Sequence, residues 1–138
     1  MPGQLSLFKS RRQRGTAAPG PTEFASQAFL VDVCRRWLDP RWKFGHIPNG
    51  EFRDPRTAGR LQRLGVVAGL PDLMFLGPGP RAAFIELKRR GGRLSPAQQA
   101  MRDHLECCGF AYLCTDSVDQ AIEWLKHHGI LRGGFSVQ

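Results

Sequence analysis

Residues 69–98 read GLPDLMFLGPGPRAAFIELKRRGGRLSPAQ, and the rest of the chain is organised around this stretch. The segments 70–76 and 82–87 within it are rich in leucine, phenylalanine and isoleucine, as short strands are. The intervening GPGPR alternates glycine with proline, which is typical of a turn. The stretch therefore predicts an antiparallel hairpin.

Two carboxylates come together in this hairpin. Asp72 lies seven residues before Gly79, the middle of the turn, and Glu86 lies seven residues after it, so strand pairing places them opposite each other. Glu86 and Lys88 are two residues apart on one strand and share a face. Charges on strands this apolar are unfavourable unless they are paired or hold a metal ion.

The composition points to an acidic partner. The 138-residue chain carries a net charge of +8, and 16 of its 20 basic residues are arginine, which binds phosphate in a bidentate way. A small basic, arginine-rich domain is typical of nucleic-acid-binding proteins. The sequence has no apolar run of the ~18 residues that a membrane span needs, and no signal peptide is evident, so we expect a cytoplasmic protein with no membrane partner.

The remaining pattern predicts the element order α-β-α-β-β-α-β-α. Helices are expected over residues 22–38, 54–64, 95–109 and 117–129, and further strands over 42–47 and 110–114. Thr22, Asp54, Ser95 and Ser117 are the expected N-caps. In the first helix Phe29, Val33 and Trp37 recur every four residues next to Phe24, which predicts one apolar face.

Basic residues gather on both sides of the hairpin in the sequence. A helical stripe at spacings of three and four and a glycine-containing loop directly after Lys88 are candidates for contact with a phosphate backbone, and the alternative is a merely solvated basic surface. A histidine on the first expected strand is a further candidate substrate contact. These candidate DNA-binding residues are Arg53, Arg56, Arg60, Arg63, Arg89, Arg90, Arg93 and His46.

The two ends of the chain differ from the rest. We expect residues 1–21 to be a disordered basic tail and residues 132–138 to be a loose end. The tail contains QLSLF, which resembles the QLxLF clamp-binding peptide of bacterial DNA replication and repair proteins, with Gln4, Leu5, Leu7 and Phe8 in the matching positions. A chance apolar cluster in a tail is the other interpretation.

Carboxylates from two adjacent strands suit a hard divalent cation. Mg²⁺ keeps several waters and binds through one or two carboxylates together with a phosphate oxygen. Such an ion polarises a phosphodiester and activates water, and Lys88 would add a point charge for the attacking water or the developing charge on phosphorus. The alternative is a buried ion-pair cluster that only holds the hairpin together, which is a poor stabiliser compared with apolar residues.

The same residues carry a family resemblance. Pro71-Asp72 followed by Glu86-Leu87-Lys88 resembles the PD-(D/E)XK nuclease signature. The surrounding GLPDL, IELK and LSPAQ resemble the VRR-NUC (virus-type replication-repair nuclease) domain, over roughly residues 22–131. The resemblance implies an α/β fold with a restriction-endonuclease-like core, a central mixed β-sheet flanked by helices, and Mg²⁺- or Mn²⁺-dependent cleavage of DNA.

The resemblance also implies roles for individual residues. By position, Asp72, Glu86 and the main-chain carbonyl of Leu87 would be metal ligands. Lys88 would act on the water, and Gln98 would orient Lys88 or the scissile phosphate. Glu23 would match the first-helix acid of the family and reach the metal directly or through water, although an acid in the first turn of a helix also complements its dipole.

Small stand-alone members of the family suggest a homodimer that acts on branched DNA, Holliday junctions especially, and two sites related by a two-fold axis would cut two strands symmetrically. A monomeric flap- or nick-directed nuclease is one alternative. A non-catalytic DNA-binding module tethered to a sliding clamp is another, and a sequence-reading restriction-type enzyme is a third.

Overall fold

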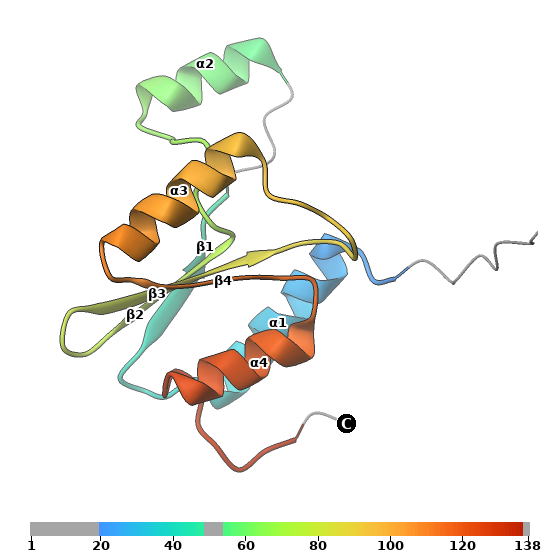
Figure 1. Cartoon of the computed structure of the whole chain (residues 1–138), viewed down its shortest axis with the longest axis vertical. Helices are drawn as coiled ribbons and strands as arrows, with labels where there is room; N and C mark the ends of the chain where they lie inside the picture. Colours follow the sequence, from blue (N-terminus) through green and yellow to red (C-terminus); the bar gives the residue numbers. More distant parts are fainter. Residues whose placement is uncertain (1–19, 49–53, 137–138) are drawn as a thin grey trace, which may run out of the picture.

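The structure, a computed structural model, describes residues 20–48 and 54–136. The predicted element order and the α/β fold class are confirmed (Figure 1). The elements are α1 (Glu23–Trp37), β1 (Lys43–His46), α2 (Pro55–Arg63), β2 (Leu73–Gly77), β3 (Arg81–Leu87), α3 (Pro96–Cys107), β4 (Ala111–Thr115) and α4 (Val118–His127). The clamp-like peptide at residues 4–8 and Arg53 lie outside the described residues.

The four strands form one mixed sheet in the order β1-β2-β3-β4. β1 and β3 both pair with β2 in the antiparallel direction, and β4 pairs with β3 in parallel after the α3 crossover. In the hairpin Leu73 pairs with Ile85 and Gly77 pairs with Arg81. This register is symmetric about Gly79, so its continuation places Asp72 opposite Glu86, as the count from the turn predicted.

Helices cover both faces of the sheet (Figure 1). α1 and α4 pack against each other on one face, and their apolar residues meet one row of strand side chains to form the main core. α3 covers the other face, where Phe84 contacts Phe110 edge to face and Leu105 is buried. The side chains of Glu86 and Asp72 belong to this α3 face. The core residues are Leu30, Val33, Cys34, Trp42, Leu73, Phe75, Ala83, Ile85, Leu87, Ala121, Ile122, Leu125, Ile130 and Leu131.

The helices begin where the sequence predicts. Thr22, Asp54, Ser95 and Ser117 each accept a hydrogen bond from a backbone N–H of the first turn, so each is the N-cap. At α3 the cap is a full capping box, because the Gln98 side chain accepts in return from the backbone N–H of Ser95. No helix in the described part of the chain is long and apolar enough to cross a membrane.

The apolar face predicted for α1 is wrong in detail. The buried residues of this helix are Ser26, Leu30, Val33 and Cys34, whereas Phe24 is 83% exposed and Phe29 is 45% exposed. Trp37 is also partly exposed and stacks on Phe135 near the C-terminus. The four-residue spacing identified an apolar stripe on α1. The side of the helix that packs against α4 and the sheet is shifted by one residue from that stripe.

Two strands also differ from expectation. β2 begins at Leu73 rather than at residue 70, because Pro71 has no N–H to donate to a ladder and Asp72 lies in a bend. β4 covers Ala111–Thr115, one residue further along the chain than the expected 110–114, and only Thr115 is fully buried. β4 is an edge strand of the sheet, which explains its half-buried side chains.

Gly69 fixes how the segment before β2 meets α3. Its φ is +89°, and a Cβ at this position would lie 2.3 Å from the carbonyl oxygen of Ala97 and 3.0 Å from the backbone nitrogen of Gln98. Only glycine therefore permits the close approach that brings Asp72 towards the first turn of α3.

We predict that Gly69→Ala destabilises the fold by roughly 2–4 kcal/mol, because it combines a left-handed backbone strain with a clash against backbone atoms. Gly79→Ala is the matched control, since Gly79 has φ +66° but nothing within 4 Å of its added Cβ. That variant should lose only about 1–2 kcal/mol from backbone strain. Urea unfolding of both variants checks this, and equal losses would contradict the packing argument.

Candidate active site

Two carboxylates lie side by side at one end of the sheet. Glu86, near the end of β3, is 2% exposed, and Asp72, one residue before β2, is half-buried. Asp72 Oδ2 accepts a hydrogen bond of 2.8 Å from the backbone N–H of Leu87. The Asp72 carbonyl accepts two more, from Ile47 N at 2.9 Å and from His46 Nδ1 at 2.8 Å. Asp72 is thus anchored to both neighbouring strands.

Lys88 and Gln98 complete a network around Glu86. Lys88 Nζ lies 2.8 Å from Glu86 Oε1 and donates to Gln98 Oε1 at 2.9 Å. Gln98 Nε2 donates to the same Glu86 oxygen at 2.7 Å. The amide therefore turns its oxygen to the cation and its nitrogen to the carboxylate. We call Asp72, Glu86, Lys88 and Gln98 the carboxylate network.

The main chain also fixes Lys88. Its N–H donates to the Thr115 carbonyl at 2.9 Å, which extends the β3–β4 ladder one step beyond the end of β3. Lys88 and Glu86 share a face of the sheet, as the two-residue spacing predicted. The position of the ammonium group is thus set by the strand, the opposing carboxylate and the helix that carries Gln98.

Glu23 reaches the same end of the sheet from α1. Its Oε1 accepts a hydrogen bond of 2.9 Å from the backbone N–H of Arg89, the residue after Lys88. The Glu23 side chain is exposed and lies at the rim of the site. Its negative charge is close enough to contribute to the raised pKa of both Asp72 and Glu86, as a minor cause.

His46 lies at the site as well. Because a carbonyl oxygen only accepts, the contact with the Asp72 carbonyl places a proton on Nδ1. Gln27 Nε2 lies 2.9 Å from the same His46 nitrogen, and turning the Gln27 amide by 180° would present its oxygen to that proton. Gln27 was not among the candidate residues. The available signal was its position one turn after Glu23 on the same helix.

Burial raises the pKa of both carboxyl groups. For Asp72 the loss of solvation outweighs the lowering effects of the Leu87 N–H and of the Lys88 charge. For Glu86 the loss of solvation outweighs the hydrogen bond from Lys88, and the neighbouring Asp72 charge raises its pKa further. Each group would gain from a cation that replaces the lost solvation.

The donor set fits a hard cation that keeps part of its water shell. Asp72 Oδ1 and Glu86 Oε2 accept no hydrogen bond from other residues in the described ranges, so one oxygen of each carboxylate is available. Within residues 20–48 and 54–136 no three His, Cys, Asp or Glu side chains form a metal-binding group. Two carboxylates with main-chain and water oxygens match Mg²⁺ coordination, whereas a closed zinc site would need more nitrogen or sulfur ligands.

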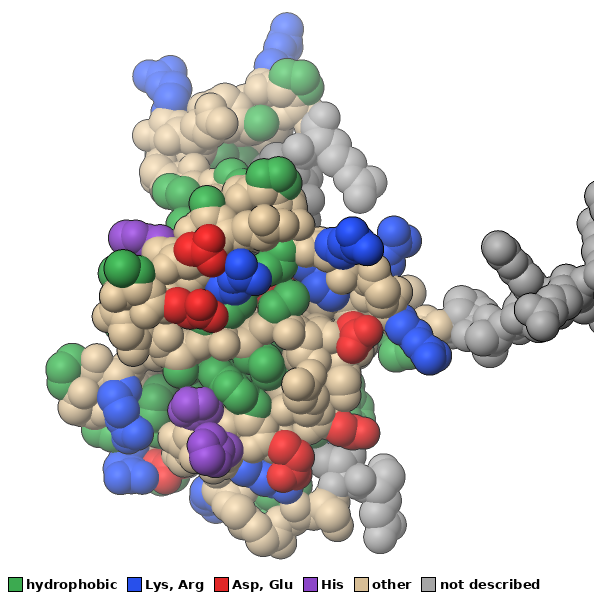
Figure 2. Space-filling model, in the orientation of Figure 1, with side chains coloured by type: hydrophobic (Ala, Val, Ile, Leu, Met, Phe, Trp, Pro, Cys, Tyr) green, Lys and Arg blue, Asp and Glu red, His purple; other side chains and the backbone are tan. Residues whose placement is uncertain are grey.

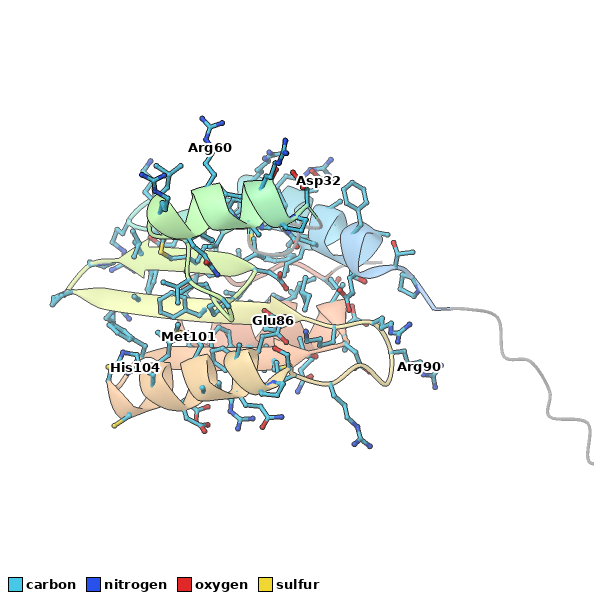
Figure 3. All side chains as sticks on the ribbon, turned by 90° about the horizontal axis from the view of Figure 1, so that it is seen from above. Asp32, Arg60, Glu86, Arg90, Met101 and His104 are labelled. Carbon is cyan, nitrogen blue, oxygen red and sulfur yellow. The ribbon has the colours of Figure 1, made fainter. Side chains whose placement is uncertain are left out.

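The predicted basic residues fall into two groups. Arg89, Arg90 and Arg93 are exposed on the loop between β3 and α3, directly after Lys88, and Figure 2 shows Lys and Arg side chains gathered over this loop. In Figure 3 Arg90 lies beyond the end of the sheet that carries Glu86. We call residues 89–93 the basic loop.

The arginines of α2 are not part of the carboxylate network. Arg56, Arg60 and Arg63 are all exposed, and Arg60 points away from the body of the molecule in Figure 3. α2 buries none of its residues. None of these three arginines has a carboxylate partner among the described residues, so their charge is open to solvent or to phosphate.

A mixed sheet with two carboxylates and a lysine at one end defines an α/β nuclease-type fold. Residues 25–118 match the family model of the VRR-NUC domain, so the chain belongs to the VRR-NUC family. No curated protein matches the sequence.

Two solved structures share the fold. One, described as a VRR_NUC domain protein, has a TM-score of 0.65 and 23% identity, with 78% of this chain and 88% of that chain covered. Another, described as a VRR_NUC domain, has a TM-score of 0.54 and 16% identity, with 79% and 99% covered. Membership of the family implies a nuclease-type function in the PD-(D/E)XK superfamily, with DNA as substrate, and such domains typically use divalent metals.

We predict that Asp72→Asn stabilises the fold at neutral pH by roughly 1 kcal/mol, or about 4 °C in Tm. The amide oxygen keeps the hydrogen bond from Leu87 N, while the buried charge is removed. Because the folded-state pKa of Asp72 is raised, its ionisation destabilises the fold as pH rises past the unfolded value of about 3.9. The gain in stability should therefore be complete at pH 7 and should vanish below the unfolded pKa of about 3.9.

Thermal unfolding across pH, without divalent metal, measures this difference. Asp116→Asn is the control, because Asp116 is exposed on the loop before α4 and should shift Tm little. An Asp72→Asn protein less stable than the parent at pH 7 would contradict the prediction.

Proposed function

We propose that this chain is a divalent-metal-dependent DNA endonuclease that hydrolyses phosphodiester bonds in branched DNA, Holliday junctions especially. The observation that carries the proposal is the carboxylate network: a buried and a half-buried carboxylate and a lysine, joined by one glutamine, at the sheet end that adjoins the basic loop. A purely structural ion-pair cluster accounts for it less well, because buried pairs stabilise less than apolar residues of the same size.

Asp72, Glu86 and the main-chain carbonyl of Leu87 would hold the metal, Mg²⁺ or Mn²⁺, and Glu23 would join them directly or through water. The bound ion would polarise the scissile phosphate and lower the pKa of a water molecule. Asp72 is suited to this task because three hydrogen bonds hold its carboxylate and carbonyl in place. Little reorganisation is then needed when the ion and substrate arrive.

Lys88 would act on the attacking water or on the charge that develops on phosphorus. An ammonium group has three N–H donors, and two of them are directed to Glu86 and Gln98. The third remains for a substrate or water oxygen. Gln98 is a positioning residue in this proposal, because it touches both the cation and the carboxylate and holds their geometry.

The basic loop and the α2 arginines would bind the DNA backbone on either side of the site, with His46 as a further substrate contact. We propose that two copies of the chain act together as a homodimer, since a symmetric pair of sites suits cleavage of two strands at a junction. A flap- or nick-directed monomer is the second candidate, and a panel of junction, flap, splayed and linear substrates separates the two.

We predict that Lys88→Ala lowers Mg²⁺-dependent cleavage of a four-way junction by about a hundredfold or more, because it removes the only cation in the carboxylate network. DNA affinity at fixed salt should change little, since the phosphate-binding charge resides mainly in arginines elsewhere. The measurement is cleavage of end-labelled junction DNA with Mg²⁺, Mn²⁺ or EDTA, beside a binding titration.

Lys43→Ala serves as the control for this experiment. Lys43 is exposed at the start of β1, at the opposite end of the sheet, so its loss should leave the cleavage rate within about twofold. If Lys88→Ala cuts the junction as fast as the parent protein, Lys88 has no catalytic role. If the parent binds branched DNA but cleaves none with either metal, the chain is a DNA-binding module.

We further propose that Gln4, Leu5, Leu7 and Phe8 dock on a bacterial sliding clamp as an extended peptide. Removing residues 1–9 should abolish clamp binding and leave nuclease turnover intact, because the deleted segment precedes the nuclease domain. Gln4→Ala with Phe8→Ala in the full chain is the matched variant. Unchanged retention of both proteins on immobilised clamp would exclude this interaction.

A further inference from the structure

The outward face of α1 changes character along its length. After Glu23, its exposed residues in the N-terminal half are the apolar Phe24, Ala25, Ala28 and Phe29, whereas those in the C-terminal half are the charged Asp32, Arg35 and Arg36 and the partly exposed Trp37. Phe24 is 83% exposed, the most exposed large hydrophobic residue in the described part of the chain. The core is built from the opposite side of the helix and does not use it. Packing of the core therefore does not explain why a phenylalanine is present at position 24.

Phe24 is held next to the candidate active site. It follows Glu23, whose carboxylate accepts from the Arg89 N–H at 2.9 Å, so the first turn of α1 is tied to the start of the basic loop. The segment before the helix lies against the same loop, since a Cβ on Gly20 would be 3.8 Å from the Cβ of Arg90. Phe24 therefore belongs to the turn of α1 that contacts the basic loop, at the rim of the candidate active site.

An aromatic ring beside unpaired arginines matches the chemistry of an unstacked nucleotide. The guanidinium groups bind phosphate oxygens of any DNA, but a base offers its face to an aromatic side chain only where it has left the helical stack. Intact duplex DNA would meet the cations and leave the ring unused. Branched or single-stranded DNA would engage both.

We propose that Phe24 stacks on an unpaired nucleobase next to the scissile phosphate and thereby favours DNA with an unstacked base at the cleavage site. This inference rests on the proposed nuclease function and names a determinant of its substrate choice. The charge of the basic loop argues for this occupant, because a second copy of the chain would bring Arg89 and Arg90 towards like charges.

Cleavage by the full chain tests the proposal on two substrates of the same sequence, a splayed duplex with one unpaired base at the fork and a fully paired duplex. Phe24→Ala should lower the rate on the splayed substrate by about tenfold and on the paired duplex by less than about twofold, and Phe24→Trp should restore the rate. Phe29→Ala is the matched control, because the same residue type lies on the same face but further from Glu23.

A second readout does not depend on turnover. With 5-iodouracil at the unpaired position and Ca²⁺ in place of Mg²⁺, irradiation should cross-link the base to Phe24, as located by mass spectrometry, and not to Phe29. If the parent protein cuts no DNA, the nuclease proposal is refuted. The cross-link still tests the stacking in that case, because it does not require cleavage. Equal cleavage by Phe24→Ala without a cross-link at Phe24 would overturn the stacking alone.

The same variants reveal any other occupant of this face. If Phe24→Ala and Phe29→Ala both convert a dimer into a monomer in sedimentation, a second copy covers the face and the proposal is wrong. If Phe24→Ala has its effect only in the full chain and not in one lacking residues 1–19, the N-terminal segment is the occupant, which also overturns it.

Discussion

Two carboxylates lie side by side at one end of a sheet, Glu86 buried and Asp72 half-buried, and they are the constraint on which the rest of this structure depends. Each has lost solvation, which raises its pKa, and the charge of Asp72 raises the pKa of Glu86 further. Such a pair is unfavourable unless nearby groups compensate for the buried charge. Compensation comes from three directions: the Leu87 N–H on the strand, the Lys88 ammonium two residues from Glu86, and the Gln98 amide from the facing helix. Strand register, the crossover to α3 and the close approach at Gly69 all serve to bring these groups together.

The Gln98 side chain takes part both in the capping box of α3 and in the carboxylate network. As the third residue of α3 it closes the capping box with Ser95, a task that glutamate performs equally well. Here a glutamate would place a third negative charge against Glu86, whereas the amide donates to that carboxylate and accepts from Lys88. The helix cap fixes the Gln98 oxygen in space, and the oxygen in turn fixes the ammonium group. The start of α3 is therefore part of the site and cannot move independently of it.

The sequence predicted those parts of the fold that local rules determine. Counting from Gly79 gave the hairpin register, and Thr22, Asp54, Ser95 and Ser117 marked the helix starts, because turns and caps depend on neighbours in the chain. It did not predict which side of α1 faces the core, since a four-residue period does not identify the packing partner. Nor did it predict the contacts of Gln27 with His46 and of Glu23 with Arg89, which join residues far apart in sequence.

The positive and negative charges of this protein are organised in opposite ways. The carboxylate network is buried or half-buried and is hydrogen-bonded, whereas the arginines of α2 and the basic loop are exposed and have no carboxylate partner within the described residues. Unpaired surface cations attract a polyanion over about a Debye length and are weakened by salt, while buried hydrogen-bonded groups are screened far less. Under the proposed function, capture of the nucleic acid by the arginines and alignment of the reacting groups by the network would thus respond differently to ionic strength. The separation also explains why basic residues gather next to the buried acids without neutralising them: Lys88 alone enters the network, and the arginines remain free for phosphate.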